Sequence, residues 1–234
     1  TNKMLFGKNE NLPLPLASIT KIMTGICALD TLGRDYILNI KKSDLVNEQK
    51  SKLLVGEEWS VRDLLSFTLI ESSNDGATAL GREVSQITPI LSCMNQKAVE
   101  LNLFETKFFN ETGLDIASSS GAYGSAENAA VLLQTAMQKY GDIFEKTQYE
   151  SYNIASESGT IHKAVNTNRV SNNIVGIISS KTGLTDIAGG NLVFAINAGL
   201  NHTVIIAILG STEEGRFTDA LELSGAVINT LGSK

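Results

Sequence analysis

The fold class of this chain is decided by the stretch Leu192-Val-Phe-Ala-Ile-Asn-Ala-Gly-Leu-Asn-His-Thr-Val-Ile-Ile-Ala-Ile-Leu209. Aliphatic and β-branched residues dominate 192–197 and 203–209. Residues 198–201 (Ala-Gly-Leu-Asn) lie between these runs and have the composition of a short hairpin loop. The stretch therefore predicts two adjacent antiparallel strands in the last third of the chain.

Further elements follow from the spacing of apolar residues elsewhere. From Ser18 to Gly33 they recur at three- and four-residue intervals, which is the period of a helix. Ser60 and Ser125 each precede a similar pattern and are the N-cap residues expected there. The remaining predicted elements are helices at 60–70, 75–85, 89–102, 125–139 and 218–231, and strands at 3–6, 149–155 and 174–178.

Helices therefore dominate the middle of the chain, and strands dominate its last third. We expect a mixed α/β (α+β) fold, in which an antiparallel sheet is flanked by helices and carries an inserted all-helical lobe. The whole chain, 1–234, is expected to form a single domain. Its helical lobe would span about 30–148, and its sheet lobe about 1–29 together with 149–234.

The composition excludes several classes of function. The 234 residues carry a formal net charge of -6, and 42% of them are hydrophobic, as in a globular protein with a substantial core. No stripe of Lys and Arg is present, so no nucleic-acid partner is expected. No apolar run is long and pure enough for a transmembrane helix. No signal peptide precedes the abrupt start at Thr1, and we interpret the sequence as a trimmed or mature form.

The few cysteines and histidines argue against a metal centre. His162 and His202 are the only two histidines, and no CxxC or HxxxH pattern occurs, so neither a metal nor another cofactor is predicted. Cys27 and Cys93 each lie in an apolar helical pattern, and we interpret them as two buried thiols. A disulfide between them stays open, because spacing along the chain does not give their distance.

Ser18-Ile-Thr-Lys21 places a hydroxyl and an amine at the start of the first predicted helix. Residues three apart lie on one face of a helix, so Ser18 and Lys21 should point the same way. A serine becomes nucleophilic when a neighbour accepts its proton, and a lysine can do so once burial or a positive charge lowers its pKa. The pair is a candidate nucleophile and base, although SxxK alone also fits an N-cap with a surface lysine.

Ser72-Ser-Asn74 interrupts two predicted helices. Ser72 could pass a proton between the catalytic groups and a leaving nitrogen. Asn74 could orient a substrate amide and hold the lysine through its side-chain carbonyl. Taken alone, the motif also fits an ordinary turn before a helix.

Lys181-Thr-Gly183 precedes a strand-rich segment. Lys181 would lower the pKa of Lys21 through its charge and would attract a substrate carboxylate, which Thr182 would hydrogen-bond. Gly183 would let a peptide substrate lie along the strand edge. Taken alone, this motif also fits a charged turn.

The three motifs occur in the order SxxK, SxN and KTG, which is the trio of class A β-lactamases and penicillin-binding proteins. The wider sequence resembles the D-alanyl-D-alanine carboxypeptidase family, the low-molecular-mass penicillin-binding proteins, over nearly the whole chain. The resemblance rests on residues 15–24, 71–77, 109–115, 166–169 and 181–189.

The resemblance implies a penicillin-binding catalytic domain of β-lactamase/transpeptidase-like fold, with its active site between the lobes. Ser18 would attack the carbonyl of the penultimate D-alanine of a peptidoglycan stem peptide, and water would resolve the acyl-enzyme after the terminal D-alanine leaves. The backbone N–H groups of Ser18 and Leu184 would form the oxyanion hole. The implied catalytic residues are Ser18, Lys21, Ser72, Asn74 and Lys181, and the implied substrate-binding residues are Thr182, Gly183, Leu184, Thr185 and Arg216.

The resemblance also implies partners and a location. Stem peptides ending in D-Ala-D-Ala would be the substrate, and β-lactam antibiotics would acylate Ser18 as inhibitors. The protein would be exported, to the periplasm or the outer face of the cytoplasmic membrane of a bacterium, and we expect a monomer.

The sequence departs from the family pattern at three places. The usual first strand is missing, the family's Gly-His before Tyr123 is Gly121-Ala122 here, and the common C-terminal β domain does not follow Lys234.

Three other functions stay open. One is a class A β-lactamase, because Glu111-Thr-Gly-Leu-Asp115 superficially resembles its Glu-x-x-Leu-Asn motif. The others are a D,D-endopeptidase that cuts peptidoglycan crosslinks and a non-catalytic peptidoglycan-binding homologue.

Overall fold

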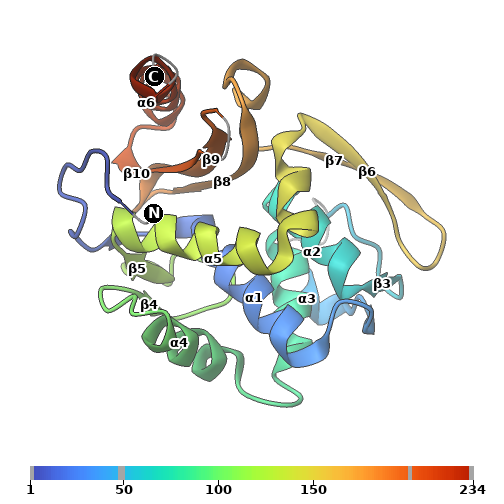
Figure 1. Ribbon diagram of the computed structural model, residues 1–234. Coiled ribbons are helices and arrows are strands. Elements are labelled where there is room, and N and C mark those ends of the chain that lie inside the picture. The colour runs from blue at the N-terminus through green and yellow to red at the C-terminus, as the bar shows by residue number, and fades with distance from the viewer. Residues whose placement is uncertain (1–2, 47–50, 200–201, 232–234) are drawn as a thin grey trace.

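A computed structural model describes residues 3–46, 51–199 and 202–231 of the chain (Figure 1). Its main sheet contains β8 (Ile177–Thr185), β9 (Gly189–Asn197) and β10 (Thr203–Ser211) in the antiparallel order β10-β9-β8. The hairpin predicted over 192–209 is confirmed as β9 and β10, with Thr203 opposite Asn197. Of its predicted loop, residues 200 and 201 lie outside the described residues.

β8 corrects the strand predicted at 174–178. The strand starts at Ile177 and runs to Thr185, so the Lys181-Thr-Gly183 motif lies within it rather than before it. Gly176 has a φ of 73°, a left-handed conformation that keeps the preceding residues out of the strand. Within the described residues β8 pairs with β9 alone, so no strand occupies its other edge along the motif.

Helices cover both faces of this sheet, and side chains alternate between them. Leu192, Phe194 and Ile196 of β9 pack in one apolar cluster with α6 (Gly215–Leu231). Val193 and Ala195 point the other way, into the larger core. α5 (Ala126–Phe144) contacts all three strands from that side. Figure 1 shows α6 above the sheet and α5 below it, so the expected fold class is observed.

The helical part of the molecule is built around α1 (Thr20–Leu32), which contacts α2 (Val61–Glu71), α3 (Asn74–Val84) and α4 (Ile90–Glu100). Every residue of α1 from Thr20 to Leu29 is buried, as expected of a helix enclosed on all sides. The described helices and strands fit the predicted architecture, while the residue limits of the two lobes stay a prediction.

The helix ends show which sequence signals were reliable. Ser60 and Ser125 are confirmed as N-caps, because their hydroxyls accept the backbone N–H groups of Asp63 and Asn128. Pro89 is itself the N-cap position of α4 rather than its first residue. α5 continues to Phe144, beyond the predicted end at 139, through a kink at Tyr140.

Short strands complete the fold. β1 (Leu14–Pro15), β5 (Ala122–Gly124) and β4 (Lys107–Phe108) form one small sheet, and β2 (Ile37–Asn39) pairs with β3 (Glu58–Ser60). The strand expected at 3–6 is wrong: these residues are exposed and form no strand. The alternating pattern at 149–155 gives β6 (Ser151–Ala155), whose partner β7 (Ile161–Val165) was not predicted.

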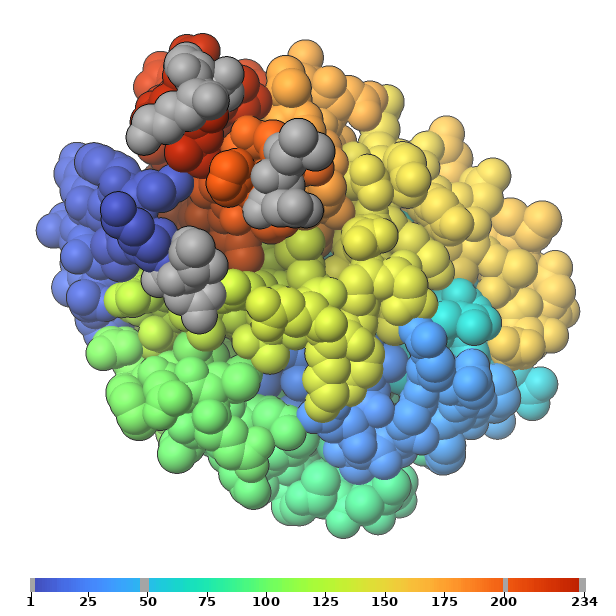
Figure 2. All heavy atoms as spheres, in the orientation of Figure 1, coloured from blue at the N-terminus to red at the C-terminus, as the bar shows by residue number. Residues whose placement is uncertain are grey.

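The β6–β7 hairpin is separate from the main sheet and lies against the helical part. Figure 2 shows it in yellow beside the blue-to-cyan surface around β3. Within this contact, His162 and Glu57 are both buried and lie 2.7 Å apart, between Nε2 and Oε1. None of the helices in the described ranges combines the length and the apolarity needed to cross a bilayer.

Cys27 and Cys93 form a disulfide between α1 and α4, with their Cα atoms 6.1 Å apart. The interpretation as two free thiols was therefore wrong. Both cysteines lie on apolar helix faces, as the sequence indicated, but only the packing of the two helices brings them within bonding distance.

Candidate active site

Ser18 and Lys21 lie together at the start of α1. Ser18 belongs to a 3-10 turn, Ala17–Ile19, that leads directly into the helix. The Nζ atom of Lys21 lies 2.8 Å from the Oγ atom of Ser18. Ala17 has a φ of 49°, an unusual conformation for a residue with a side chain, and it sets the direction in which the next residue enters the helix. The hydroxyl–amine pair predicted from the spacing is present.

The surroundings of Lys21 favour its neutral form. Its amine also lies 2.8 Å from Oδ1 of Asn74 and 2.6 Å from the carbonyl oxygen of Thr112, and the side chain is fully buried. Burial lowers the pKa of Lys21 from 10.5 to about 7, and the negative charge of Glu111 opposes that shift. Of the two causes that the sequence allowed, burial is therefore the main one, and the charge of Lys181 is not among the causes of the pKa shift of Lys21. A neutral amine at this position can accept the proton of Ser18.

The SxN motif supplies the second hydroxyl. Ser72 ends α2 with a φ of 58°, and this left-handed turn directs the chain into α3, which begins at Asn74. Lys181 Nζ lies 2.8 Å from Ser72 Oγ and donates to the carbonyl oxygen of Thr182 at 2.9 Å. Burial lowers the pKa of Lys181 well below its usual value, and the charges of Lys21 and Arg216 add to that effect. The site therefore contains two hydroxyl–amine pairs.

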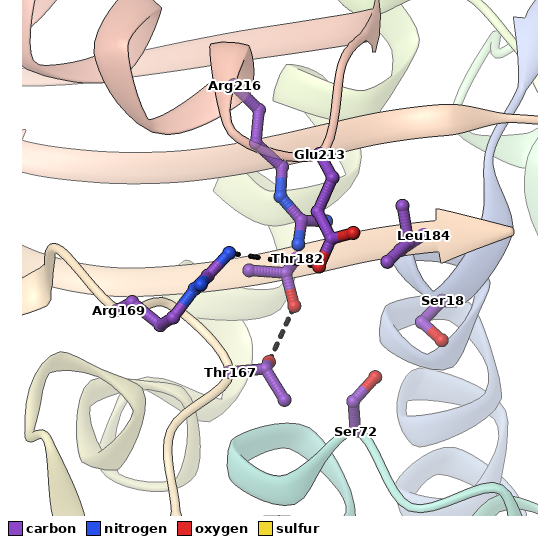
Figure 3. Close-up of a pocket in the computed structure, with 8 residues that line it drawn as sticks. All are labelled: Ser18, Ser72, Thr167, Arg169, Thr182, Leu184, Glu213 and Arg216. Carbon is purple, nitrogen blue, oxygen red and sulfur yellow. Dashed lines mark hydrogen bonds and ion pairs between the residues drawn. The ribbon is translucent and has the colours of Figure 1, made fainter.

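These groups adjoin a cleft of about 340 Å³ (Figure 3). Figure 3 shows the side chains of Ser18 and Ser72 near one another at one end of it. The residues that line the cleft are Ser18, Ser72, Thr167, Arg169, Thr182, Leu184, Glu213 and Arg216. Lys21, Asn74 and Lys181 are not among the lining residues: the two lysines contact the hydroxyls of Ser18 and Ser72, and Asn74 contacts Lys21. Five of the lining residues were predicted, whereas Thr167, Arg169 and Glu213 were not assigned to the site.

Gly183 allows β8 to approach the turn that carries the nucleophile. A Cβ atom at this position would lie 2.8 Å from the carbonyl oxygen of Leu16 and 3.2 Å from the side chain of Ala17. Arg216 then fixes the strand from the other side, because its Nη1 donates to the carbonyl oxygen of Gly183 at 2.6 Å. Only 5% of Arg216 is exposed, and its guanidinium stacks on the ring of Phe217 at 4.6 Å.

The two threonines of the predicted substrate-binding set differ in position. Thr182 faces the cleft, where its hydroxyl lies 2.5 Å from that of Thr167. Thr185 does not line the cleft, and its hydroxyl donates to Asp115 at 3.0 Å. Thr185 thereby holds the β8–β9 turn to the loop that contains Asp115.

Comparison with known proteins agrees with this arrangement. A sequence model described as D-alanyl-D-alanine carboxypeptidase matches residues 1–213. The chain belongs to the D-alanyl-D-alanine carboxypeptidase family. Among relatives, D-alanyl-D-alanine carboxypeptidase DacF of Bacillus subtilis is 32% identical over 227 residues, which are 92% of this chain and 56% of that protein. A D-alanyl-D-alanine endopeptidase of Pseudomonas aeruginosa is 29% identical, over 95% of this chain and 72% of that protein.

A solved structure extends the similarity to the fold. Penicillin-binding protein D2 of Listeria monocytogenes, in its ampicillin-bound form, superposes with a TM-score of 0.79 at 27% identity. The match covers 96% of this chain and 92% of that one. The predicted fold class and family are thereby confirmed. The chain spans little more than half the length of the Bacillus carboxypeptidase.

One contact in this member of the carboxypeptidase family was missed from the sequence, namely the Thr112 carbonyl that holds Lys21. The residue in the sequence that could have indicated this contact is Gly113. Its φ is 80°, and a Cβ atom there would lie 1.9 Å from the carbonyl oxygen of Ala17. A glycine is required for the loop to reach the first turn of α1, so this position indicates a close approach of two backbones.

Gly113→Ala is therefore expected to lower the stability of the fold and to slow acylation. The new methyl group combines left-handed strain of about 1–2 kcal/mol with a backbone clash, and we expect a total loss of about 3–5 kcal/mol. Urea unfolding would measure it. Gly56→Ala is the matched control: its φ of 86° carries similar strain, but nothing lies within 4 Å of its Cβ position. Equal losses in the two variants would contradict the close-approach argument.

The shifted pKa of Lys21 predicts the pH dependence of acylation. Lys21 must be neutral to accept a proton, so the second-order rate with penicillin should rise with pH through about 7 and then level off. Stopped-flow labelling between pH 5.5 and 9 would measure this. The exposed His202→Gln should keep the profile unchanged. A rate independent of pH across this range would count against Lys21 as the base.

Proposed function

We propose that this protein is a serine D,D-carboxypeptidase that removes the terminal D-alanine from peptidoglycan stem peptides. One observation carries the proposal: the buried amine of Lys21 lies 2.8 Å from both Ser18 Oγ and Asn74 Oδ1, beside an open cleft. A buried, hydrogen-bonded lysine beside a serine that faces solvent is an arrangement for activating a nucleophile.

The first half of the reaction forms an acyl-enzyme. Neutral Lys21 takes the proton of Ser18 as its oxygen attacks the carbonyl carbon of the penultimate D-alanine. The backbone N–H groups of Ser18 and Leu184 are the proposed donors to the developing oxyanion. The C–N bond then breaks, and the proton that Lys21 took from Ser18 passes through Ser72 to the leaving nitrogen of the terminal D-alanine, so that Lys21 is neutral again; Ser72 is held by Lys181.

The second half releases the shortened peptide. Water enters the place of the departed D-alanine, loses a proton to Lys21, and attacks the ester carbonyl. The ester C–O bond then breaks, and Ser18 leaves as it takes the proton from Lys21, which returns both groups to their starting states. Apart from the water and the substrate, only side chains of this chain take part in these proton transfers, and the proposal includes no cofactor.

The cleft offers groups that fit the two ends of such a substrate. Thr182 and Arg216 are proposed to bind the terminal carboxylate, because a hydroxyl and a guanidinium there face the same space (Figure 3). The free edge of β8 can receive the peptide backbone as an added strand. Asn74 is proposed to orient the substrate amide.

β-Lactams are proposed as covalent inhibitors that acylate Ser18, since penicillin imitates the D-Ala-D-Ala end. The ampicillin-bound form of the Listeria relative supports the proposal that this chain also binds β-lactams.

We also propose that the protein acts outside the cytoplasm, where peptidoglycan lies. The Cys27–Cys93 disulfide supports an oxidising compartment. We expect it to act as a monomer.

Mass spectrometry after incubation with a D-Ala-D-Ala peptide, and separately with penicillin, tests the proposal. The expected results are a peptide lighter by one alanine and a protein heavier by one penicillin on Ser18. Rapid release of hydrolysed penicillin would instead indicate a β-lactamase. The position of Glu111 speaks against that function, because its carboxylate accepts from Thr78 at 3.3 Å and does not line the cleft. If the protein reacts with neither the D-Ala-D-Ala peptide nor penicillin, the result would favour a non-catalytic homologue.

A D,D-endopeptidase is the second candidate, favoured by the similarity to the Pseudomonas endopeptidase. Both reactions use the same acyl-enzyme and differ only in the leaving amine. Digestion of purified crosslinked muropeptides separates them, since cleavage of dimers to monomers requires endopeptidase activity.

A further inference from the structure

An ion-pair cluster contributes two residues, Arg169 and Glu213, to the lining of the cleft. Arg169 Nη2 lies 2.6 Å from Glu214 Oε1 and 3.8 Å from Glu213 Oε1. Arg169 belongs to the loop after β7, whereas the two glutamates belong to the loop between β10 and α6. These three residues, here called the rim bridge, therefore join segments that are far apart in the sequence.

The rim bridge has a rigid base. The Arg169 guanidinium lies over the ring of Phe217 at 4.9 Å, and the same ring carries the guanidinium of Arg216. Phe217 is buried at the start of α6. Such stacking restricts the arginine more than an exposed ion pair alone would.

The location of the rim bridge relates it to the substrate. Arg169 and Glu213 line the cleft together with Thr182. In Figure 3 Arg169 lies at the end of the cleft opposite Ser18, with Thr182 between it and the nucleophile, and the dashed line joins it to Glu213, which lies above Thr182 on the side of Leu184. If Thr182 and Arg216 bind the carboxylate of the leaving D-alanine, the arginine of the rim bridge lies just beyond the end of that residue.

We propose that the rim bridge selects the leaving group, by closing the cleft to amines that belong to a longer chain. The inference rests on the proposed function. A terminal D-alanine ends at its carboxylate, so it fits in the cleft between Ser18 and the rim bridge. In a crosslink, the leaving amine belongs to a neighbouring stem peptide, which must continue past this end of the cleft. Arg169 is thus a positioning residue that favours removal of D-alanine over cleavage of crosslinks.

The expected effect is moderate, because the bridge is partly exposed: the side chains of Arg169 and Glu214 are 53% and 74% accessible. Exposed ion pairs and cation–π contacts are each weak and can open. Their combined loss should change the preference for the two leaving groups by about three- to ten-fold.

The test is a competition in one tube between a monomeric stem peptide ending in D-Ala-D-Ala and a purified crosslinked muropeptide dimer. Mass spectrometry gives the ratio of the two kcat/KM values. Arg169→Ala, and independently Glu214→Gln, should raise the dimer-to-monomer ratio about three- to ten-fold. The charge-exchanged double variant Arg169→Glu with Glu214→Arg should return the ratio toward that of the unmodified protein, which a purely structural role would not do.

Arg34→Ala is the matched control, because Arg34 and Asp142 form an exposed pair at 2.5 Å that does not line the cleft. Its ratio should equal that of the unmodified protein. Ratios within two-fold for both bridge variants, or an equal rise in the control, would overturn the inference while leaving the carboxypeptidase proposal intact. If the unmodified protein acts on neither peptide, the proposed function fails and the inference fails with it.

Discussion

Ser18→Ala is expected to abolish covalent labelling by penicillin and release of D-alanine, while the fold stays intact. Ser18 is the hydroxyl that both faces the cleft and adjoins Lys21. The hydroxyl of Ser72 also faces the cleft, but it is paired with Lys181. Removing one partly exposed hydroxyl opens no large cavity, so the melting temperature should change little. Gel fluorescence with a labelled penicillin and intact-protein mass would measure the loss.

Ser73→Ala is the control for this variant. Ser73 is a neighbouring serine whose hydroxyl caps α3 by accepting the N–H of Gly76. Its loss should cost about 1 kcal/mol of stability and leave labelling in place. Ser18 would be refuted as the nucleophile if Ser18→Ala is still labelled and peptide mapping finds the label on the same residue as in the unmodified protein.

Lys21→Met is expected to reduce the rate of acylation by about 10²–10⁴, the usual range for a lost acid–base group. The loss would be larger if the serine and lysine act as one unit. The rise of the rate with pH should disappear at the same time, because no group remains to take the proton of Ser18. Stopped-flow labelling by penicillin across the pH range measures both effects.

Methionine keeps most of the volume of the lysine, which makes the stability of this variant informative. Lys21 is fully buried, and burying its amine is costly. Asn74 and Thr112 each lose a partner in the variant, which offsets part of the gain. We expect a melting temperature close to that of the unmodified protein together with very slow acylation. A collapse of the melting temperature would mean that slow acylation reports a damaged fold.

The sequence predicted well those features that depend on neighbouring residues. Ser60 and Ser125 are helix caps because a hydroxyl there meets a backbone N–H three residues on. The hairpin at 192–209 followed from two β-branched runs of similar length. Ser18 and Lys21 face one another because helical turns fix that relation.

Other features depend on how distant segments pack, and the sequence could not supply them. The Cys27–Cys93 disulfide exists because α1 and α4 lie side by side. The strand β7 contains Ile161, His162 and Lys163, a mixture that has no clear strand pattern. It becomes a strand by pairing with β6. The Arg169–Glu214 pair joins two loops whose meeting requires the whole sheet to be in place.

The disulfide has a practical consequence for producing the protein. It closes a loop between positions 66 residues apart and ties α1, the helix that carries Lys21, to α4. By the chain-entropy estimate, such a link adds about 4 kcal/mol to the free energy of unfolding. A preparation made under reducing conditions would lack this link. Its yield and shelf life would then depend on an oxidation step, even though neither sulfur takes part in catalysis.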